Sequence, residues 1–194
     1  MLNDIAFTPA VRAEQERRGS RRIFERHDFR TGARELAAFL ADVDTAYLAT
    51  ASAQGQPYAQ HRGGPPGFIK VIDDETIGFA DFRGNRQYVT TGNLAENDKA
   101  ILFLMDYAHR RRIKVWGRAR MVEDPAVIEA LVDPAYPATA ERALLFTVAA
   151  FDMNCPQHIP QKIDAELVRR ALASRDERIA ALEAELAALR APEA

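Results

Sequence analysis

Six or seven short segments with a strand-like pattern, separated by turn residues, constrain the fold of this chain most strongly. They are 45–52, 58–61, 68–73, 76–80, 100–106, 111–123 and 143–153. The first four predict two adjacent hairpins, because a short turn joins the members of each pair. These strands do not alternate with long helices, as a parallel sheet would require. The pattern therefore predicts a mainly β chain of the α+β class, built on an antiparallel barrel.

Helical patterns lie before, between and after these strands. The predicted helices are 9–18, 31–42, 124–133 and 164–190, with an irregular or short helical crossover at 84–98. Thr8, Thr31 and Asp124 are candidate caps for the first three helices. Gly117 predicts a bulge or a close backbone approach within its strand. With 194 residues, 47% of them hydrophobic, the chain can form one domain with a full core and an appended helix.

The composition argues against several classes of partner. Lys and Arg total 26 and Asp and Glu total 28, which gives a formal net charge of −2. A near-neutral chain offers no electrostatic case for nucleic acid or for an anionic membrane. The single cysteine, Cys155, cannot form an internal disulfide. The first residues lack a secretory pattern, and no run approaches the roughly 18 apolar residues of a membrane helix. A soluble cytoplasmic protein is expected.

A cationic turn follows the second predicted hairpin. Its polar side chains are Arg83, Asn85, Arg86 and Gln87. Guanidinium forks and amides can hold the oxygens of a phosphate, such as that of flavin mononucleotide (FMN). Gly84 would allow backbone N–H groups to turn toward the same oxygens. The alternative interpretation is a polar surface turn in which Arg83 pairs with Asp81 or Asp98.

Lys70 lies in a predicted strand between two apolar residues, Ile69 and Val71. Because side chains alternate along a strand, the lysine should lie on the opposite face from these neighbours. There its ammonium could stabilise negative charge on a reduced flavin ring, and Phe68 could flank the ring. The alternative is an outward lysine on a half-solvated sheet, beside a phenylalanine that belongs to the core.

Two later segments also suit a ligand. HRRRIK, residues 109–114, brings together four cations, Arg110, Arg111, Arg112 and Lys114. That excess favours an anionic ligand, or else a solvated turn between strands. NCPQHIPQ, residues 154–161, is expected to be irregular because of its two prolines, and Gln157 and His158 could form a wall of a ligand site. Cys155 is expected to be a small buried hydrophobe, and no spacing of residues predicts a metal site.

The C-terminal helix carries an apolar stripe. Its residues Leu172, Ile179, Leu182, Leu186 and Leu189 follow spacings of 7, 3, 4 and 3, and Val168 extends the series. This is the seven-residue repeat of a coiled coil, interrupted at Arg175. The stripe could pair across a dimer or pack on the barrel of its own chain. The fully polar opposite face favours the dimer.

The segment from Phe39 to Lys162 resembles the pyridoxamine 5′-phosphate oxidase-like family of FMN-binding split-barrel proteins. The most specific part is GFIKVIDDETIGFADFRGNRQYVTTGNL, residues 67–94. DTAYLATASAQGQPYAQHRGGPPGF, residues 44–68, resembles the opening hairpin of the family. AILFLMDYAHRRRIKVWGRARMVED, residues 100–124, resembles the strand pair that follows. FDMNCPQHIPQK, residues 151–162, resembles the ending of an uncharacterised bacterial flavin-nucleotide-binding subgroup.

The resemblance implies a homodimer with two FMN sites at the subunit interface. The residues implied in flavin contacts are Phe68, Ile69, Lys70, Ala80 and Asp81. Arg86 and Gln87 fall where the family places an Arg–Lys pair on the phosphate. Because Gln87 lacks the lysine charge, Arg83, Asn85 or Asn93 would compensate. The residues expected to complete the site from the partner subunit are Arg111, Arg112, Gln157 and His158.

The function implied is that of an FMN-dependent oxidoreductase acting on an unknown small substrate. The arginine and tryptophan region that binds pyridoxal phosphate in true oxidases has no counterpart here, so oxidation of pyridoxamine phosphate is not implied. The alternatives are a non-catalytic flavin-binding or sensing module, and a haem-binding protein that uses His158. The expected organisation is an N-terminal arm or helix (1–30), an FMN-binding split-barrel domain (31–162) and a C-terminal helix (163–194).

Overall fold

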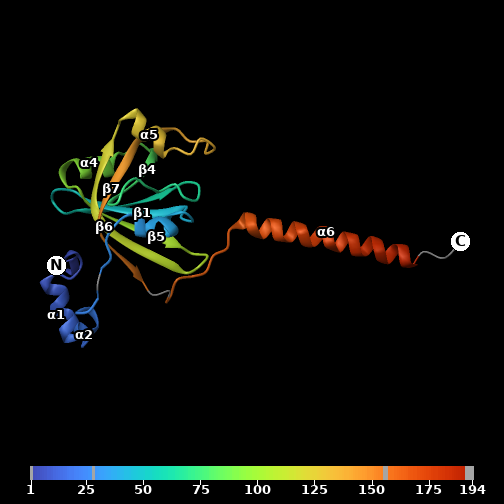
Figure 1. Ribbon diagram of the computed structural model, residues 1–194, viewed down its shortest axis with the longest axis horizontal. Helices are drawn as coiled ribbons and strands as arrows, with labels where there is room; N and C mark the ends of the chain where they lie inside the picture. The colour runs from blue at the N-terminus through green and yellow to red at the C-terminus, as the bar shows by residue number, and fades with distance from the viewer. Residues whose placement is uncertain (1, 28, 155–156, 191–194) are drawn as a thin grey trace.

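The computed structural model describes residues 2–27, 29–154 and 157–190 (Figure 1). Seven strands form one antiparallel sheet in the order β2-β1-β5-β6-β7-β4-β3. They are β1 (Thr45–Ala51), β2 (Pro57–Gly63), β3 (Lys70–Val71), β4 (Thr76–Phe82), β5 (Lys99–Asp106), β6 (Arg111–Val122) and β7 (Ala140–Asn154). The sheet surrounds the main apolar core without closing, so β2 and β3 remain edges, and a smaller apolar cluster lies between the sheet and α5. An antiparallel α+β fold of the split-barrel type is confirmed.

Short helices connect the strands, and one long helix follows them. The helical elements are η1 (Leu2–Ile5), α1 (Pro9–Arg17), α2 (Arg21–Phe24), η2 (Arg34–Leu36), α3 (Ala37–Leu40), α4 (Val89–Glu96), α5 (Pro125–Leu131) and α6 (Ala165–Arg190). Thr8 accepts a hydrogen bond from Val11 N–H at the start of α1, and Asp124 accepts one from Ala126 N–H at the start of α5. Two of the three predicted caps, Thr8 and Asp124, are therefore confirmed.

The helix predicted over 31–42 is present only as η2 and α3. Gly32 has a φ of 89°, which is not helical, and Ala33 N–H donates to Asp74 O at 2.7 Å. This bond ties the segment to the β3–β4 turn, so Thr31 does not cap a helix. The apolar face that defined the prediction is nevertheless correct, because Leu36 and Phe39 are buried in the core.

The second predicted hairpin has a shorter first strand than the sequence indicates. Phe68 N–H donates to Pro65 O, which closes a turn immediately before β3. Ile72 N–H donates to Thr76 O across the next turn. Only Lys70 and Val71 therefore pair with β4. The glycine- and proline-rich loop extends through residue 69 and places Phe68 beside β4, where the candidate site lies.

Gly117 interrupts the register between β6 and β7, as predicted for a bulge. A Cβ at this position would lie 2.0 Å from the carbonyl oxygen of Thr147. That separation is far below van der Waals contact, so the two strands can cross closely here only at a glycine. The close approach and the bulge are the same feature.

The N-terminal helices join the body through an aromatic cluster. Phe7 contacts Phe24 and Phe29, with ring centroids 5.5 and 5.4 Å apart. Phe29 in turn lies edge-on to Trp116, the only tryptophan, at 5.2 Å. A further tie comes from Arg30, whose backbone forms a bridge with Phe151 on β7. The N-terminal arm is thus attached to the outer side of β6 and β7.

Helix α6 projects away from the barrel (Figure 1). It has 26 residues, and none of them is buried. The predicted long helix is confirmed, but it makes no core with its own barrel. Among the described residues, no helix combines the length and the apolar character needed to cross a membrane.

Candidate functional site

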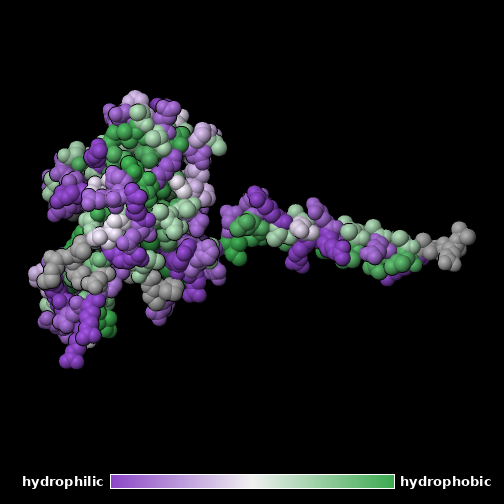
Figure 2. Space-filling view, in the orientation of Figure 1, coloured by the Kyte–Doolittle hydropathy of each residue, from purple (hydrophilic) through white to green (hydrophobic). Residues whose placement is uncertain are grey.

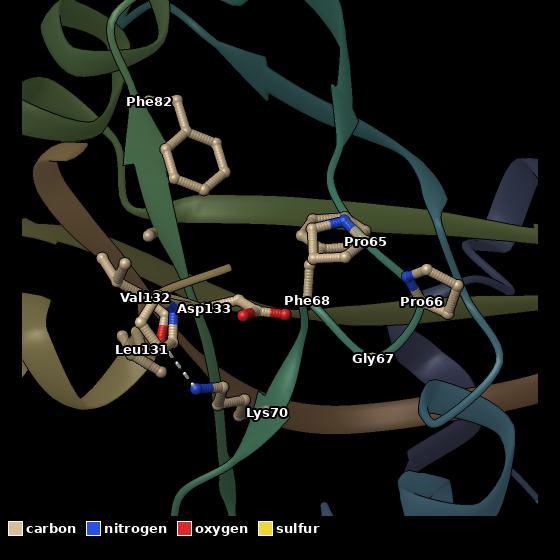
Figure 3. Close-up of a pocket in the computed structure, with 11 residues that line it drawn as sticks. Pro65, Pro66, Gly67, Phe68, Lys70, Phe82, Leu131, Val132 and Asp133 are labelled. Atoms are coloured by element: carbon tan, nitrogen blue, oxygen red, sulfur yellow. Dashed lines mark hydrogen bonds between the residues drawn. The ribbon is translucent and has the colours of Figure 1, made fainter. Parts of the chain in front are cut away.

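Three adjoining hollows lie along β4, and Phe82 lines all of them. The arginine pocket, of about 40 Å³, is lined by Arg62, Arg86 and Arg142 together with the start of α4. The central groove, of about 330 Å³, is lined by residues that include Phe68, Ala80 and Arg83. The Lys70 pocket, of about 150 Å³, lies between the loop 65–68 and the end of α5 (Figure 3). One strand therefore connects a cationic end, an aromatic middle and a lysine end.

A buried carboxylate organises the arginine pocket. Asp81, on β4, is only 5% exposed and accepts hydrogen bonds from Arg62 on β2 and from Arg142 on β7. Arg142 is also the direct register partner of Asp81 across the sheet. The Nε atoms of both arginines are buried and have no hydrogen-bond partner within the described chain. The carboxylate thus fixes two guanidiniums whose donor capacity is only partly used.

The turn between β4 and α4 has an unusual backbone. Arg86 and Tyr88 both have positive φ, 61° and 54°, a region that residues with a Cβ adopt rarely. Arg86 Nε donates to the Tyr88 hydroxyl at 3.4 Å, and this bond raises the pKa of Arg86. The guanidinium of Arg142 lies 4.8 Å from the centre of the Tyr88 ring. Backbone strain of this kind is typical of binding sites, because the surroundings must hold it in place.

Helix α4 begins at the arginine pocket. Its N-cap residue, Tyr88, makes no capping hydrogen bond with its side chain. Thr90 and Thr91, in the first turn, line the pocket, and Thr90 Oγ1 donates to Gln60 Oε1 at 2.9 Å. The free N–H groups and the positive end of a helix dipole favour an anion at such a position.

Arg83 stands at the border between the arginine pocket and the central groove. Its Nε donates to Glu141 on β7 at 2.8 Å, and this bond lowers the pKa of the Glu141 carboxyl. The surface-turn interpretation paired Arg83 with Asp81 or Asp98, but neither pair is present. Asp98 instead pairs with Arg118 at 2.6 Å.

Aromatic rings form the walls of the central groove. Phe68 is packed edge-on against Phe79 at 5.7 Å, and Phe82 lies 5.3 Å from the ring of Tyr136. Ala80, with its small side chain, lies between them on β4 and lines the groove. Phe68 and Phe79 are 6% and 1% exposed and belong to the core, so Phe82 and Tyr136 present most of the aromatic surface of the groove.

Lys70 lies at the far end of β4 from the arginines. Its Nζ donates to the carbonyl oxygens of Ala130 and Val132, at 3.0 and 3.3 Å. The dashed line in Figure 3 follows the second of these bonds. An ammonium on the last carbonyls of α5 stabilises the end of that helix. Because an ammonium has three N–H donors, one remains for the pocket.

Of the other residues predicted for the site from the same stretch, only Asn85 lines one of the three hollows. Ile69 is 2% exposed and belongs to the apolar core. Asn93 is buried in α4, where its side chain donates to Thr50 Oγ1 at 3.0 Å. Gln87 is exposed and lines none of the three hollows, whereas Asn85 does line the arginine pocket and accepts from Gln87 N–H.

The residues expected from a partner subunit are distant from the hollows of their own chain. Arg111, at the start of β6, donates to the buried carboxylate of Asp106. Arg112 lies with its guanidinium 6.0 Å from the Phe103 ring. Gln157 and His158 are exposed. None of these four residues lines the three hollows, and Cys155 lies outside the described residues.

Several residues of the arginine pocket were not predicted from the sequence. They are Gln60, Arg62, Tyr88, Thr90, Thr91, Glu141 and Arg142. Arg62 and Thr90 occur within or beside the quoted motif, so alternation along β2 could have indicated that Arg62 faces inward. Arg142 has no local signal, because only the pairing of β4 with β7 brings it to Asp81.

Comparison with solved structures shows the same fold in a distantly related HupZ protein. A HupZ protein of Group A Streptococcus is similar to this chain with a TM-score of 0.51 and 15% identity, over 68% of this chain and 98% of that one. A variant of the same HupZ protein gives a TM-score of 0.50 and 16% identity, over 63% and 98%. An FMN-binding protein from Syntrophomonas wolfei subsp. wolfei gives 0.49 and 17% identity, over 75% and 95%. A search of curated proteins found no match.

The family follows from the sequence itself. A family model described as "Pyridoxamine 5'-phosphate oxidase" matches residues 33–180, which is most of the chain. The chain therefore belongs to the pyridoxamine 5′-phosphate oxidase family. The matched region contains every strand of the sheet and all three hollows along β4.

Proposed function

We propose that this chain binds FMN along β4, with the cofactor phosphate in the arginine pocket. The observation that carries the proposal is the convergence of three arginines on the uncapped start of α4. Charge-assisted hydrogen bonds and a helix N-terminus are two independent ways of holding a phosphate. Here both point into the same pocket.

The charges of the site fit a phosphate that carries nearly two negative charges. Four arginines line the arginine pocket and the adjoining groove, namely Arg62, Arg83, Arg86 and Arg142, beside two carboxylates, Asp81 and Glu141. The local excess of two positive charges would be neutralised by the phosphate. The buried Nε atoms of Arg62 and Arg142, which have no partner within the described chain, are available as donors to it.

The remaining two hollows suit the rest of the cofactor. The aromatic walls of the central groove would exclude water from a flat ring, and the spare N–H of Lys70 lies at the opposite end from the arginines. When bound, FMN supplies hydride or single-electron transfer. The chain's own residues would hold the phosphate, orient the ring and stabilise negative charge near Lys70. We propose this redox role for an unidentified small substrate, with no side chain acting as acid or nucleophile.

A homodimer is part of the proposal. Arg111, Arg112, Gln157 and His158 are remote from the hollows of their own chain, so a contribution from them requires a second copy at the groove. The segment 31–162 would then be the FMN-binding domain.

Binding is tested by titrating the purified protein with FMN and, separately, with riboflavin, which lacks the phosphate. We expect the flavin fluorescence of FMN to be quenched and FMN to bind at least about tenfold more tightly, because one charged hydrogen-bonding group is at stake. Equal affinities would contradict the arginine pocket, and no binding of either would contradict the proposal as a whole.

Catalysis is tested separately, by reduction of the bound flavin. The FMN-loaded protein is mixed without oxygen with NADH, NADPH or a reduced deazaflavin, and bleaching of the flavin absorbance is followed. Reduction by one of them supports the oxidoreductase role. Tight flavin binding without reduction by any donor would favour the non-catalytic binding or sensing module.

A further inference from the structure

Helix α6 exposes an apolar stripe that nothing in the described chain covers. Figure 2 shows hydrophobic surface recurring along its length. The stripe consists of Val168, Leu172, Ile179, Leu182, Leu186 and Leu189, which are between 41% and 78% exposed. An isolated helix gains little stability in water unless its apolar face packs against something. The 26 residues of α6 therefore need a cover from outside the barrel.

The spacing of the apolar residues indicates what kind of surface packs on the stripe. Leu172, Ile179 and Leu186 repeat every seven residues, and Leu182 and Leu189 repeat in the same way three residues further on. A seven-residue repeat of this form keeps one seam facing a partner helix along its whole length. The partner with a matching seam is another α6.

The charges beside the seam distinguish between the two possible directions. In a parallel coiled coil in register, the residue just before Ile179 or Leu186 faces the residue five places later in the other helix. Arg178 would face Glu183 of the second copy, and Glu185 would face Arg190. Both pairs have opposite charges, and symmetry forms each of them twice. None of these four side chains has an ion pair within the described chain.

Arg175 is the one interruption of the seam, and the parallel arrangement also accommodates it. The knob formed by Arg175 would pack beside Asp176 of the second copy, which offers a carboxylate. The residue that would otherwise face Asp176 is Ala171, which carries no charge and leaves space. The defect in the stripe is thus matched by an acidic residue that has no other partner across the seam.

The antiparallel arrangement places like charges together. When two copies run in opposite directions and overlap the whole stripe, Asp176 faces Asp176 and Arg178 faces Arg178. Each like-charge contact is unfavourable, and only the contact between Arg169 and Glu183 is favourable. We propose that α6 pairs with α6 of a second copy as a parallel, in-register coiled coil. This interface involves none of the residues in the arginine pocket.

A disulfide-trapping experiment tests the proposal in the full chain, with Cys155→Ser as the background. A parallel seam brings Leu186 against its own counterpart, so Leu186→Cys should cross-link under mild oxidation. Ala184→Cys, on the outer side of the helix, is the matched control. We expect Leu186→Cys to cross-link at least about tenfold faster, because pairing raises the effective concentration of the thiols. Equal rates, or no cross-link, would overturn the proposal.

A mixture of Leu172→Cys with Leu182→Cys tests the opposite direction, since these positions meet only in the antiparallel overlap. A hetero-cross-link between them that exceeds the Leu186→Cys reaction would overturn the parallel arrangement.

Charge reversal provides a second test that does not alter the apolar stripe. Arg178→Glu and Glu183→Arg should each slow the Leu186→Cys cross-link by about tenfold, because two attractive contacts become repulsive. The double reversal should restore the rate. Arg178→Glu also places a glutamate three residues after Arg175 on the same helix, which favours the helix itself. Slower cross-linking in Arg178→Glu can then not be attributed to an unfolded α6. Unchanged rates in both single variants would overturn the charge assignment.

Discussion

The arginine pocket and α6 leave opposite kinds of groups unmatched. In the arginine pocket, the buried carboxylate of Asp81 accepts from two arginines, whereas the guanidiniums around it keep spare donors. In α6, the polar side chains are solvated, whereas the apolar ones remain exposed. An unmatched buried donor calls for a ligand that accepts hydrogen bonds, and an unmatched apolar stripe calls for a protein surface. The proposed small-molecule site and the proposed assembly surface therefore lie on separate parts of the chain.

The largest effect that we predict is a loss of stability when the buried carboxylate of Asp81 is replaced. Asp81→Asn should lower the free energy of unfolding by about 3 to 5 kcal/mol, because it leaves Arg62 and Arg142 charged and without their shared partner. Urea denaturation followed by Trp116 fluorescence measures the change. The matched control is Asp98→Asn, which removes an exposed ion pair with Arg118 and should cost less than about 1 kcal/mol. Equal costs would mean that burial does not distinguish the two carboxylates.

Arg86 lines the arginine pocket but is exposed, so its replacement tests ligand binding separately from stability. Arg86→Ala should weaken FMN binding by about 1.5 to 3 kcal/mol, the loss of a charged hydrogen-bond donor. Riboflavin binding and the unfolding midpoint should change little. Arg118→Ala, an exposed arginine on β6, is the control. Unchanged FMN affinity in Arg86→Ala would remove this residue from the phosphate site.

A third carboxylate, Asp106, makes the stability of the fold depend on pH. Burial alone would raise its pKa, but hydrogen bonds from His109 N–H, Arg111 and the His109 ring outweigh burial and lower the pKa below its ordinary value of 3.8. A lowered pKa in the folded state stabilises the fold above the ordinary value, and this contribution is lost as the pH falls through the folded value. Asp106→Asn should therefore cost about 1 to 2 kcal/mol at neutral pH.

The pH profile is the decisive measurement for Asp106. The difference between the natural protein and Asp106→Asn should persist from pH 7 to about 5 and then shrink below about pH 4, as the carboxylate becomes protonated. Urea titrations at several pH values measure it. A difference that grows as the pH falls would show that the ionised carboxylate is not the stabilising form.

Local patterns in the sequence predicted most of the fold. Gly117 indicated the bulge, and Asp124 before Pro125 indicated the start of α5, because both depend on neighbouring residues only. The helix at 31–42 was overestimated because the bond from Ala33 to Asp74 joins segments that are distant in sequence. Tertiary contacts of this kind override helical periodicity.

The candidate site was predictable only in part, for the same reason. Asn85 and Arg86 lie in one turn, so the sequence places them together. Arg142 is 61 residues from Asp81, and only the register of β4 with β7 makes them partners. Lys70 was correctly assigned to the face opposite Ile69, but its carbonyl partners at the end of α5 follow from the packing of a helix onto the sheet. Residue types therefore indicated a candidate anion site, and the sheet determines which arginines line the arginine pocket.

The smallest expected effect belongs to α6. Ending the chain after residue 163 should change the free energy of unfolding of the barrel by less than about 0.5 kcal/mol, because no residue of α6 is buried. Trp116 lies in the aromatic contact with Phe29, so its fluorescence reports on the barrel without a contribution from the helix. Far-ultraviolet circular dichroism should meanwhile lose the helical signal of α6. A loss of about 2 kcal/mol or more would mean that α6 packs on its own barrel, since that is the magnitude of burying one or two large apolar side chains. Full stability of the shortened chain, together with unchanged FMN binding, would separate the assembly site from the flavin site.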